Sequence, residues 1–227
     1  MFKEIDLILS EEAFNGPVQM ALDEILLRNV GKATLRVYRW NARWITFGYF
    51  QKMADVIAAH PGVPSVRRWT GGGIVEHGNH NQTDLTFSLV IPKGDPLAIL
   101  PPRNFYKMLH GRIGEWLSNH LCSEVYLAGI HEIHNGSSCF KAPAIDDLMM
   151  KGRKILGGAQ RRSAGAFLYQ GSIQGIGVEV QSLQDNLGLA HALAPKVLPT
   201  SLSSTFKEKA LGLAEDRYLT RSWNELF

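Results

Sequence analysis

Apolar residues recur with a helical spacing soon after the start of the chain. One helix face would carry Val18, Ala21, Leu22, Ile25 and Leu26. The preceding Asn15-Gly16-Pro17 is typical of a helix start, because proline is tolerated in the first turn. Two short strands are expected next, over 34–40 and 44–47.

Strict alternation marks the clearest predicted strand, residues 84–91. Its apolar positions are Leu85, Phe87, Leu89 and Ile91. This period of two predicts a strand with one buried face, which the Pro-Lys-Gly-Asp-Pro run over 92–96 would end. A second amphipathic helix is predicted from Phe105 to Leu117, with Asn104 as its cap.

The second half of the chain mixes strands and helices. Lys151-Gly152 resembles a hairpin turn with arms 147–150 and 153–156, and residues 166–173 are predicted to form another strand. Helical patterns follow near 204–214 and 221–227. Strands and helices do not alternate regularly, so the pattern favours an α+β fold over a doubly wound sheet.

Composition narrows the picture to an ordinary globular protein. The chain has 227 residues, 45% of them hydrophobic, and a net charge of +3. This length suits a single domain, 1–227, which buries roughly 70% of its unfolded surface and needs no disulfide or metal to fold. Five charges in the first twelve residues argue against a secretion signal, and no apolar run approaches the ~20 residues of a membrane span. We expect a cytoplasmic protein that binds neither nucleic acid nor membranes.

Residues 67–73 (Arg-Arg-Trp-Thr-Gly-Gly-Gly), followed by His77, are a first candidate for chemistry. The three glycines would let backbone N–H groups approach a ligand, and the arginines would supply charge for an anion or a carbonyl. A simple glycine turn with solvated arginines explains the same residues equally well. The segment is neither a Walker loop nor a dinucleotide fingerprint, because the required spacing is absent.

Cys139 and Lys154 are the other two candidates. Cys139 lies in a run of Gly, Ser and Pro, which favours an accessible thiol, whereas Cys122 follows an amphipathic helix and is expected to pack. Lys154 would stand on a strand that runs into a bend at Gly157-Gly158, from which its ammonium could meet a carbonyl or a thiolate. A solvated basic hairpin and an incidental loop thiol are the alternatives.

Taken together, these segments resemble the lipoate–protein ligase and octanoyltransferase superfamily, which also includes biotin–protein ligases. The resemblance rests on five blocks in the same order: 16–24 (N-M-A-x-D-E), 35–51, 67–73 with His77 (R-R-x-[ST]-G-G-[GR]), 154–160 (K-[IV]-x-G-[SN]-A-Q) and 171–173 (H-G-S-I). It implies a mixed, largely antiparallel sheet flanked by helices. The core match is 16–173, with a helical C-terminal part over 185–227.

Cys139 points to one branch of the superfamily. Cys139-Phe140, Pro143 and Leu148 resemble the C-F-x-x-P-S-x-Y-E-L segment of cysteine-dependent octanoyltransferases, in which the cysteine takes the acyl chain as a thioester. The chain departs from that branch in several places. Gly73 is ligase-like, Gln170 replaces a histidine, Ala144 and Asp146 replace Ser and Tyr, and 78–83 do not match the transferase loop.

The resemblance implies catalysis by Cys139 and Lys154. The octanoyl group would pass from octanoyl-acyl carrier protein through Cys139 to the lysine of a lipoyl domain of a 2-oxoacid dehydrogenase E2 component, or of the glycine-cleavage H protein. Lys154 would lower the thiol pKa and hold the carbonyl oxygen. The substrate would be bound by Arg68, Thr70, Gly71, Gly72, Gly73, His77, Gly157, Gly158, Ala159 and Ser172. His77 is also a possible general base or a structural histidine.

Two rival functions stay open. In an ATP-dependent lipoate ligase, Lys154 and Arg68 would contact an acyl-adenylate, and ATP with Mg²⁺ would be required, whereas the transferase would need no cofactor and no metal. Gly73 favours the ligase, and Cys139 favours the transferase. A non-catalytic member that only docks lipoyl domains is the third possibility, supported by Gln170 alone.

Overall fold

The computed structural model describes residues 1–227 apart from 11, 79–83, 134–141 and 177–182. The helices and strands are β1 (Glu4–Leu9), α1 (Gly16–Asn29), β2 (Thr34–Tyr38), β3 (Trp44–Phe47), α2 (Met53–Ala59), β4 (Ser65–Arg67), β5 (Val75–His77), β6 (Asp84–Ile91), η1 (Pro96–Ile99), α3 (Pro102–Leu121), β7 (Tyr126–Leu127), η2 (Ile130–Glu132), β8 (Leu148–Met150), β9 (Arg153–Ser163), β10 (Ala166–Gln174), α4 (Leu183–Leu193), β11 (Lys196–Thr200), α5 (Ser204–Leu213), η3 (Ala214–Tyr218) and α6 (Arg221–Asn224).

Two sheets organise the described part of the chain. The larger has eight strands in the order β11-β1-β2-β6-β10-β9-β8-β7, and the smaller has the order β4-β3-β5. In the large sheet β1 is parallel to β11 and to β2, and the other pairs are antiparallel. The expected α+β class, with a mixed and largely antiparallel sheet, is therefore confirmed.

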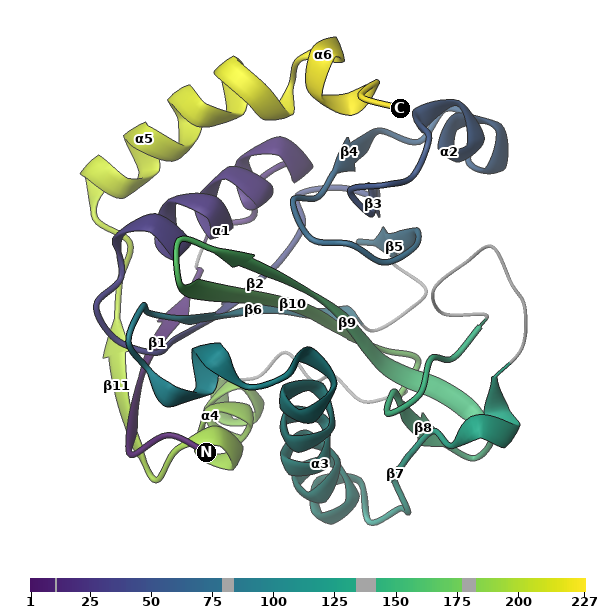
Figure 1. Ribbon diagram of the computed structural model, residues 1–227, viewed down its shortest axis with the longest axis vertical. Coiled ribbons are helices and arrows are strands. Elements are labelled where there is room, and N and C mark those ends of the chain that lie inside the picture. The colour runs from purple at the N-terminus through teal and green to yellow at the C-terminus, as the bar shows by residue number, and fades with distance from the viewer. Residues whose placement is uncertain (11, 79–83, 134–141, 177–182) are drawn as a thin grey trace.

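The large sheet lies between two helical layers. In Figure 1, α1 and α5 lie above the sheet, α3 and α4 lie below it, and the small sheet stands beside α1. Helix α1 contacts β6 and β10 of the large sheet as well as β3 and β4 of the small one. This helix therefore joins the two sheets on the face where the candidate site lies.

Helix α1 begins where the sequence predicts, because the side chain of Asn15 accepts a hydrogen bond from Val18 N at 3.0 Å. The helix is buried on all sides rather than on one face, since α5 and η3 pack against its outer side. Three polar residues, Gln19, Asp23 and Glu24, are among those fully buried. Each of them therefore needs a polar partner inside the protein.

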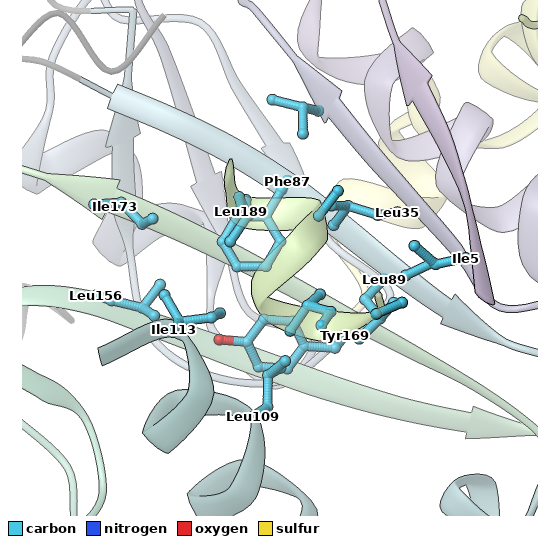
Figure 2. Close-up of a cluster of buried hydrophobic side chains, with 14 of the residues drawn as sticks. Ile5, Leu35, Phe87, Leu89, Leu109, Ile113, Leu156, Tyr169, Ile173 and Leu189 are labelled. Carbon is cyan, nitrogen blue, oxygen red and sulfur yellow. The ribbon is translucent and has the colours of Figure 1, made fainter. Parts of the chain in front are cut away.

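Strand β6 matches its predicted bounds but not its predicted burial. Every residue from Leu85 to Ile91 is buried, so the expectation of one buried face is wrong. The odd positions enter a large apolar core with α3 and α4, part of which Figure 2 shows. Of the even positions on the side of α1, Thr86 and Ser88 hydrogen-bond to other buried side chains, whereas Val90 joins a smaller apolar cluster with Leu26 and Leu27.

Other local predictions need correction. Helix α3 begins at Pro102, because the Pro101–Pro102 pair fixes its first turn, so Asn104 is not its cap. Gly157 and Gly158 do not form a bend. They lie inside β9, opposite Ser172 and Gly171 of β10. Cys122 is exposed rather than packed.

The C-terminal part was expected to be helical over 185–227. Its helices α4, α5 and α6 are interrupted by β11, which pairs with β1 at the edge of the large sheet. Helix α5 packs on α1, and α6 contacts β4 of the small sheet. The C-terminal helices therefore support the elements that surround the site.

Candidate functional site

A cavity of about 160 Å³ opens between the large sheet, the small sheet and α1. Its described lining residues are Met20, Tyr38, Trp40, Thr46, Arg68, Gly72, Val75, His77, Thr86, Tyr106, Ala142, Ala144, Asp147, Lys154, Gly157, Gly158, Ala159, Gln170, Gly171 and Ser172. Apolar side chains and glycines supply most of this wall, and a few polar groups project into it. Such a lining suits an acyl chain with one reactive polar end.

The glycine-rich loop forms one wall, and Arg68 fixes its shape. The Arg68 guanidinium donates to the carbonyls of Gly71 and Gly73 at 2.9 and 2.8 Å and to Thr46 Oγ1 at 2.8 Å. Gly72 between them has φ of +84°, a conformation that glycine adopts without strain. Of the three glycines, Gly72 is the one among the described lining residues.

The neighbouring Arg67 has a different role. Its guanidinium is fully buried and donates to the backbone carbonyls of Tyr49, Gln51, Trp223 and Asn224. It therefore ties α6 and the turn after β3 to β4, and it is not among the described residues that line the cavity. Only one of the two adjacent arginines thus faces the cavity.

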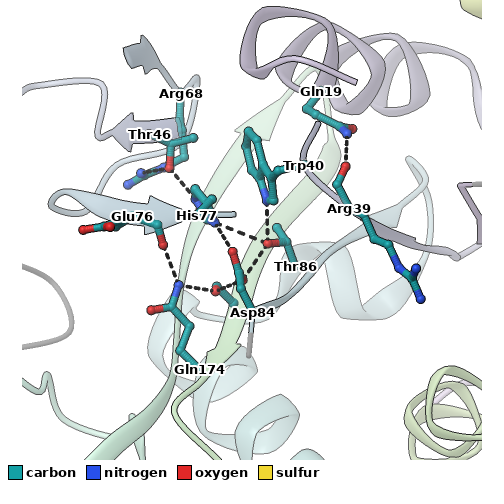
Figure 3. Close-up of polar contacts among 11 residues, drawn as sticks. Gln19, Arg39, Trp40, Thr46, Arg68, Glu76, His77, Asp84, Thr86 and Gln174 are labelled. Carbon is teal, nitrogen blue, oxygen red and sulfur yellow. Dashed lines mark hydrogen bonds and ion pairs between the residues drawn. The ribbon is translucent and has the colours of Figure 1, made fainter. Parts of the chain in front are cut away.

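His77 is held by a hydrogen-bond network that Figure 3 shows. Its Nδ1 lies 2.9 Å from Asp84 Oδ2, and its Nε2 lies 2.9 Å from Thr46 Oγ1. The ring also stacks on Trp40 with 4.2 Å between centroids. Because both ring nitrogens have partners, this geometry favours a bracing role for His77 over that of a general base.

Asp84 receives several donors in the same network. Thr86 donates to its Oδ1 at 2.8 Å, and Ser172 donates to the same oxygen at 2.7 Å. Burial acts to raise the pKa of Asp84, but the facing His77 and these hydrogen bonds hold the pKa below its ordinary value. The predicted site residue Ser172 thus both lines the cavity and anchors this carboxylate.

Lys154 enters the cavity as a buried ammonium. It lies 2.8 Å from Asp147 Oδ2, and the two side chains are 5% and 1% exposed, which places the pair out of bulk solvent. Tyr106 of α3 donates to the other oxygen of Asp147 at 2.5 Å and accepts from Gly158 N at 3.0 Å. Burial, helped by Tyr169 and Asp147, raises the pKa of Tyr106, so its hydroxyl remains a donor at neutral pH.

A second layer supports Tyr106. Its ring packs on His110 with 3.8 Å between centroids, and His110 Nδ1 lies 2.7 Å from the carbonyl of Asp146. A carbonyl can only accept, so Nδ1 carries the hydrogen and Nε2 accepts from Tyr169 Oη at 2.6 Å. A Cβ on Gly158 would lie 2.2 Å from that hydroxyl, so glycine is required there.

Gln170, which stands where the resemblance expects histidine, connects the loop to α1. Its amide donates to Asp23 Oδ2 at 2.7 Å and accepts from Thr70 Oγ1 at 2.7 Å. Asp23 Oδ1 in turn accepts from Arg36 at 2.7 Å and from Ser88 at 2.6 Å. Thr70 therefore acts on the loop from behind the cavity and is not among the described lining residues.

Most of the residues that the sequence predicted for the site line the cavity. It is lined by Lys154, Arg68, Gly72, His77, Gly157, Gly158, Ala159 and Ser172, while Thr70, Gly71 and Gly73 flank this wall. Cys139 lies outside the described residues. Sequence reasoning missed Tyr106 and Asp147, although Asp147 occupies the acidic position of the C-F-x-x-P-S-x-Y-E-L segment.

Two further features of the described residues bear on function. Outside the four segments left undescribed, no group of three or more His, Cys, Asp or Glu residues could hold a metal ion. Among the same residues, no helix is long and apolar enough to cross a membrane.

Known proteins resemble this chain across most of its length. The family model of the lipoyl protein ligase A/B catalytic domain matches residues 15–189. Octanoyltransferase LipM of Staphylococcus epidermidis is 34% identical over 70% of this chain, and the match covers 62% of that relative. Octanoyltransferase LipM of Brevibacillus brevis is 31% identical over 90% of this chain and 76% of its own length. The chain thus spans between three fifths and four fifths of these relatives.

A solved structure extends the likeness to the fold. The Thermoplasma acidophilum protein Ta0514, solved with bound lipoic acid, superposes with a TM-score of 0.75. It is 21% identical, and the match covers 98% of this chain and 99% of that one. This neighbour bears on the fold alone. The chain belongs to the lipoyl protein ligase A/B catalytic domain family.

Proposed function

We propose that this chain is an octanoyltransferase of lipoate biosynthesis, with Cys139 as its nucleophile and Lys154 as its cationic partner. The observation that carries the proposal is the Lys154 ammonium, which is buried in the wall of an apolar cavity. Ala142 lines the same cavity, and Cys139 precedes it by three residues, which span about 10 Å when extended. The chain length therefore permits the thiol to reach the ammonium.

Acyl transfer proceeds in two steps. The Cys139 thiolate attacks the carbonyl of the octanoyl thioester on an acyl carrier protein, a new C–S bond forms, and the carrier leaves as a thiol after taking a proton. The ε-amine of a lipoyl-domain or H-protein lysine then attacks the octanoyl-enzyme, an amide forms, and Cys139 leaves with a proton. Both steps start from a thioester, so neither consumes a nucleotide.

Lys154 would act in both steps. A free cysteine has a pKa near 8.5, so a nearby cation is needed to raise the thiolate fraction at neutral pH. The same ammonium can hold the oxyanion of each tetrahedral intermediate. The hydrogen bonds that Tyr106 and Ala144 N donate to Asp147, the latter at 2.6 Å, keep the carboxylate in place beside Lys154.

The apolar part of the cavity suits a short acyl tail. Burial of an octanoyl chain contributes on the order of 5 kcal/mol at ~0.8 kcal/mol per methylene. Association costs an estimated 4–15 kcal/mol, so the tail alone would bind weakly. Contacts to the carrier protein should therefore provide part of the affinity.

Intact-mass spectrometry tests the proposal. The purified protein is incubated with octanoyl-acyl carrier protein and no ATP, and a hydroxylamine-sensitive octanoyl adduct is expected. The adduct should vanish in Cys139→Ala and persist in Cys122→Ala, which removes the exposed second cysteine. Lys154→Met should slow its formation.

The same experiment separates the alternatives. No adduct with the carrier, together with acyl-adenylate formation from ATP and free octanoate or lipoate, would establish the ligase. This outcome is worth testing because Gly73 resembles the ligase sequence. Binding of lipoyl domains without either reaction would indicate a non-catalytic member.

A further inference from the structure

Arg161 stands between two aromatic rings beside the cavity. Its guanidinium carbon lies 5.0 Å from the Trp69 ring centroid and 5.3 Å from that of Tyr49. Within the described residues its side chain makes no hydrogen bond or ion pair, and its Nε is shielded from solvent without a partner. The aromatic rings hold the cation in place, so its donors remain available to a ligand.

Two further guanidiniums face the same indole. Arg28 lies 5.7 Å from the Trp69 centroid and Arg217 lies 6.0 Å from it, and both pair with Glu24. Three positive charges therefore surround Trp69, and one described carboxylate offsets them. This imbalance creates a positive potential centred on Arg161, the member of the group without an acidic partner among the described residues.

The position of Arg161 follows from strand geometry. Arg161 shares one face of β9 with Gly157 and Ala159, which line the cavity. Its aromatic neighbours border the glycine-rich loop, since Tyr49 N donates to Thr70 O at 2.9 Å. The cation is therefore adjacent to the cavity and lies four strand residues, about 13 Å, from Gly157 beside Lys154.

The proposed acyl donor carries an anion, and its distance from the thioester is similar to the distance between Gly157 and Arg161. In a carrier protein the thioester sulfur ends a pantetheine arm whose other end is a phosphodiester. This arm is as long as roughly four extended residues, about 13–14 Å. A thioester at Lys154 can therefore place its phosphate near Arg161.

We propose that Arg161, held between Trp69 and Tyr49, binds the phosphate of the acyl donor's phosphopantetheine arm. This inference rests on the proposed function, because it takes the donor to be a pantetheine thioester. The guanidinium donates to the phosphate oxygens, and the Trp69 and Tyr49 rings fix its orientation. A nucleotide phosphate is the other source of the same chemistry, and the experiment separates the two.

The test compares donors that differ only in the phosphate. The values of kcat/KM are measured with octanoyl-pantetheine and octanoyl-4′-phosphopantetheine in the wild type, Arg161→Gln and Arg162→Gln. We expect the wild type to prefer the phosphorylated donor by about tenfold, the size of one hydrogen bond to a charged group. Arg161→Gln should lose this preference and keep its activity on octanoyl-pantetheine.

Arg162→Gln is the matched control. Arg162 is the next residue of β9, but it is exposed and donates to the carbonyl of Leu100, with its guanidinium over Phe167 on the opposite face. This variant should keep the preference. A preference that survives in Arg161→Gln, or that is missing from the wild type, would overturn the inference.

Two further measurements distinguish a carrier-protein phosphate from a nucleotide phosphate. They also distinguish a failure of this inference from a failure of the proposed function. An Arg161-dependent reaction with ATP and octanoate, without a preference between the donors, would reassign the anion to a nucleotide and overturn the proposal. If no donor supports transfer, the proposed function fails. Calorimetric titration with 4′-phosphopantetheine and pantetheine then tests Arg161 on its own, and equal affinities would contradict the inference.

Discussion

The two buried faces of the large sheet differ in their side chains: the face toward α3 and α4 is apolar, whereas the face toward α1 combines polar side chains with apolar ones such as Val90 and Leu168. On β6, Leu89 faces α3 and α4 while Ser88 faces α1, and both are 0% exposed. The same division continues on β10, where Tyr169 enters the apolar core and Gln170 enters the polar network. Burial alone therefore does not distinguish the core of this protein from its site.

The two faces differ in which substitutions their side chains tolerate. Apolar neighbours such as Leu89 need volume and shape, and similar side chains can replace them. On the polar face, Asp23 accepts from Arg36, Ser88 and Gln170, so each partner is fixed by the others. One face thus contributes mainly stability, and the other holds the glycine-rich loop through Thr70.

The largest effect is expected from Arg36→Met on the polar face. It leaves the Asp23 carboxylate buried without its cation, which should cost about 3–5 kcal/mol of unfolding free energy. Urea denaturation measures the loss. The double variant Asp23→Leu with Arg36→Met should regain part of it, because the unpaired charge is gone while Ser88 and Gln170 lose their acceptor. A single variant as stable as the wild type would show that the pair is not the anchor of this face.

Leu89→Ala on the apolar face should cost about 3 kcal/mol, because it leaves a cavity in the core. The kcat for octanoyl transfer per folded molecule should stay at its wild-type value, since the side chain points away from the site. Denaturation and kinetics on the same preparation check both parts. If kcat fell although the protein was fully folded, the apolar face would also contribute to function, contrary to the expectation.

Local sequence rules predict those elements whose start and end are determined by their own residues. The Asn15 cap and the proline after it mark the start of α1, and strict alternation marks the bounds of β6. The burial of Thr86 and Ser88 escapes those rules, because polar residues usually indicate a solvent-exposed face. Asp23, the partner of Ser88, lies on α1. Asp84, the partner of Thr86 on the same strand, is also bound by His77 of β5 and Ser172 of β10, so only the assembled fold reveals the buried network.

The site shows the same limit. The order of the five family-like blocks predicts that Arg68, Gly72 and Lys154 share a site, and all three line the same cavity. Neighbouring Arg67 looks equivalent in sequence but holds α6 instead. Tyr106 comes from an amphipathic helix in which a tyrosine indicates only packing. Its bond to Asp147, which directly precedes β8, depends on how α3 packs below the large sheet.

His110 is an exception to the contrast between the two faces, because it is a titratable group buried on the apolar side. Burial lowers its pKa to about 3, so the folded protein keeps it neutral while the unfolded chain takes up a proton near pH 6.5. Stability should therefore fall as the pH drops below about 6.5, by up to about 1.4 kcal/mol per unit. Denaturation between pH 7.5 and 5 measures the slope.

His110→Asn supplies the comparison, because its amide can still donate to the carbonyl of Asp146. The variant should lose this part of the slope, whereas His131→Asn, at an exposed histidine, should retain it. An unchanged slope in His110→Asn would mean that other groups cause the acid sensitivity.

The smallest expected effect comes from Tyr106→Phe, where the apolar and polar faces meet. The substitution keeps the ring on His110 but removes the hydroxyl that bonds Asp147 and Gly158 N, so stability should fall by only about 1 kcal/mol. The hydrogen bond to Asp147 is lost, and the carboxylate is free to turn toward Lys154 with both oxygens. Under the proposed mechanism, Lys154 then offers less positive charge to the reacting thioester. We expect kcat for transfer to fall about tenfold, close to 1.4 kcal/mol, with KM nearly unchanged. Tyr126→Phe, on β7 outside the cavity, is the matched control. A Tyr106→Phe enzyme with wild-type kcat would show that Lys154 holds its position without help from α3.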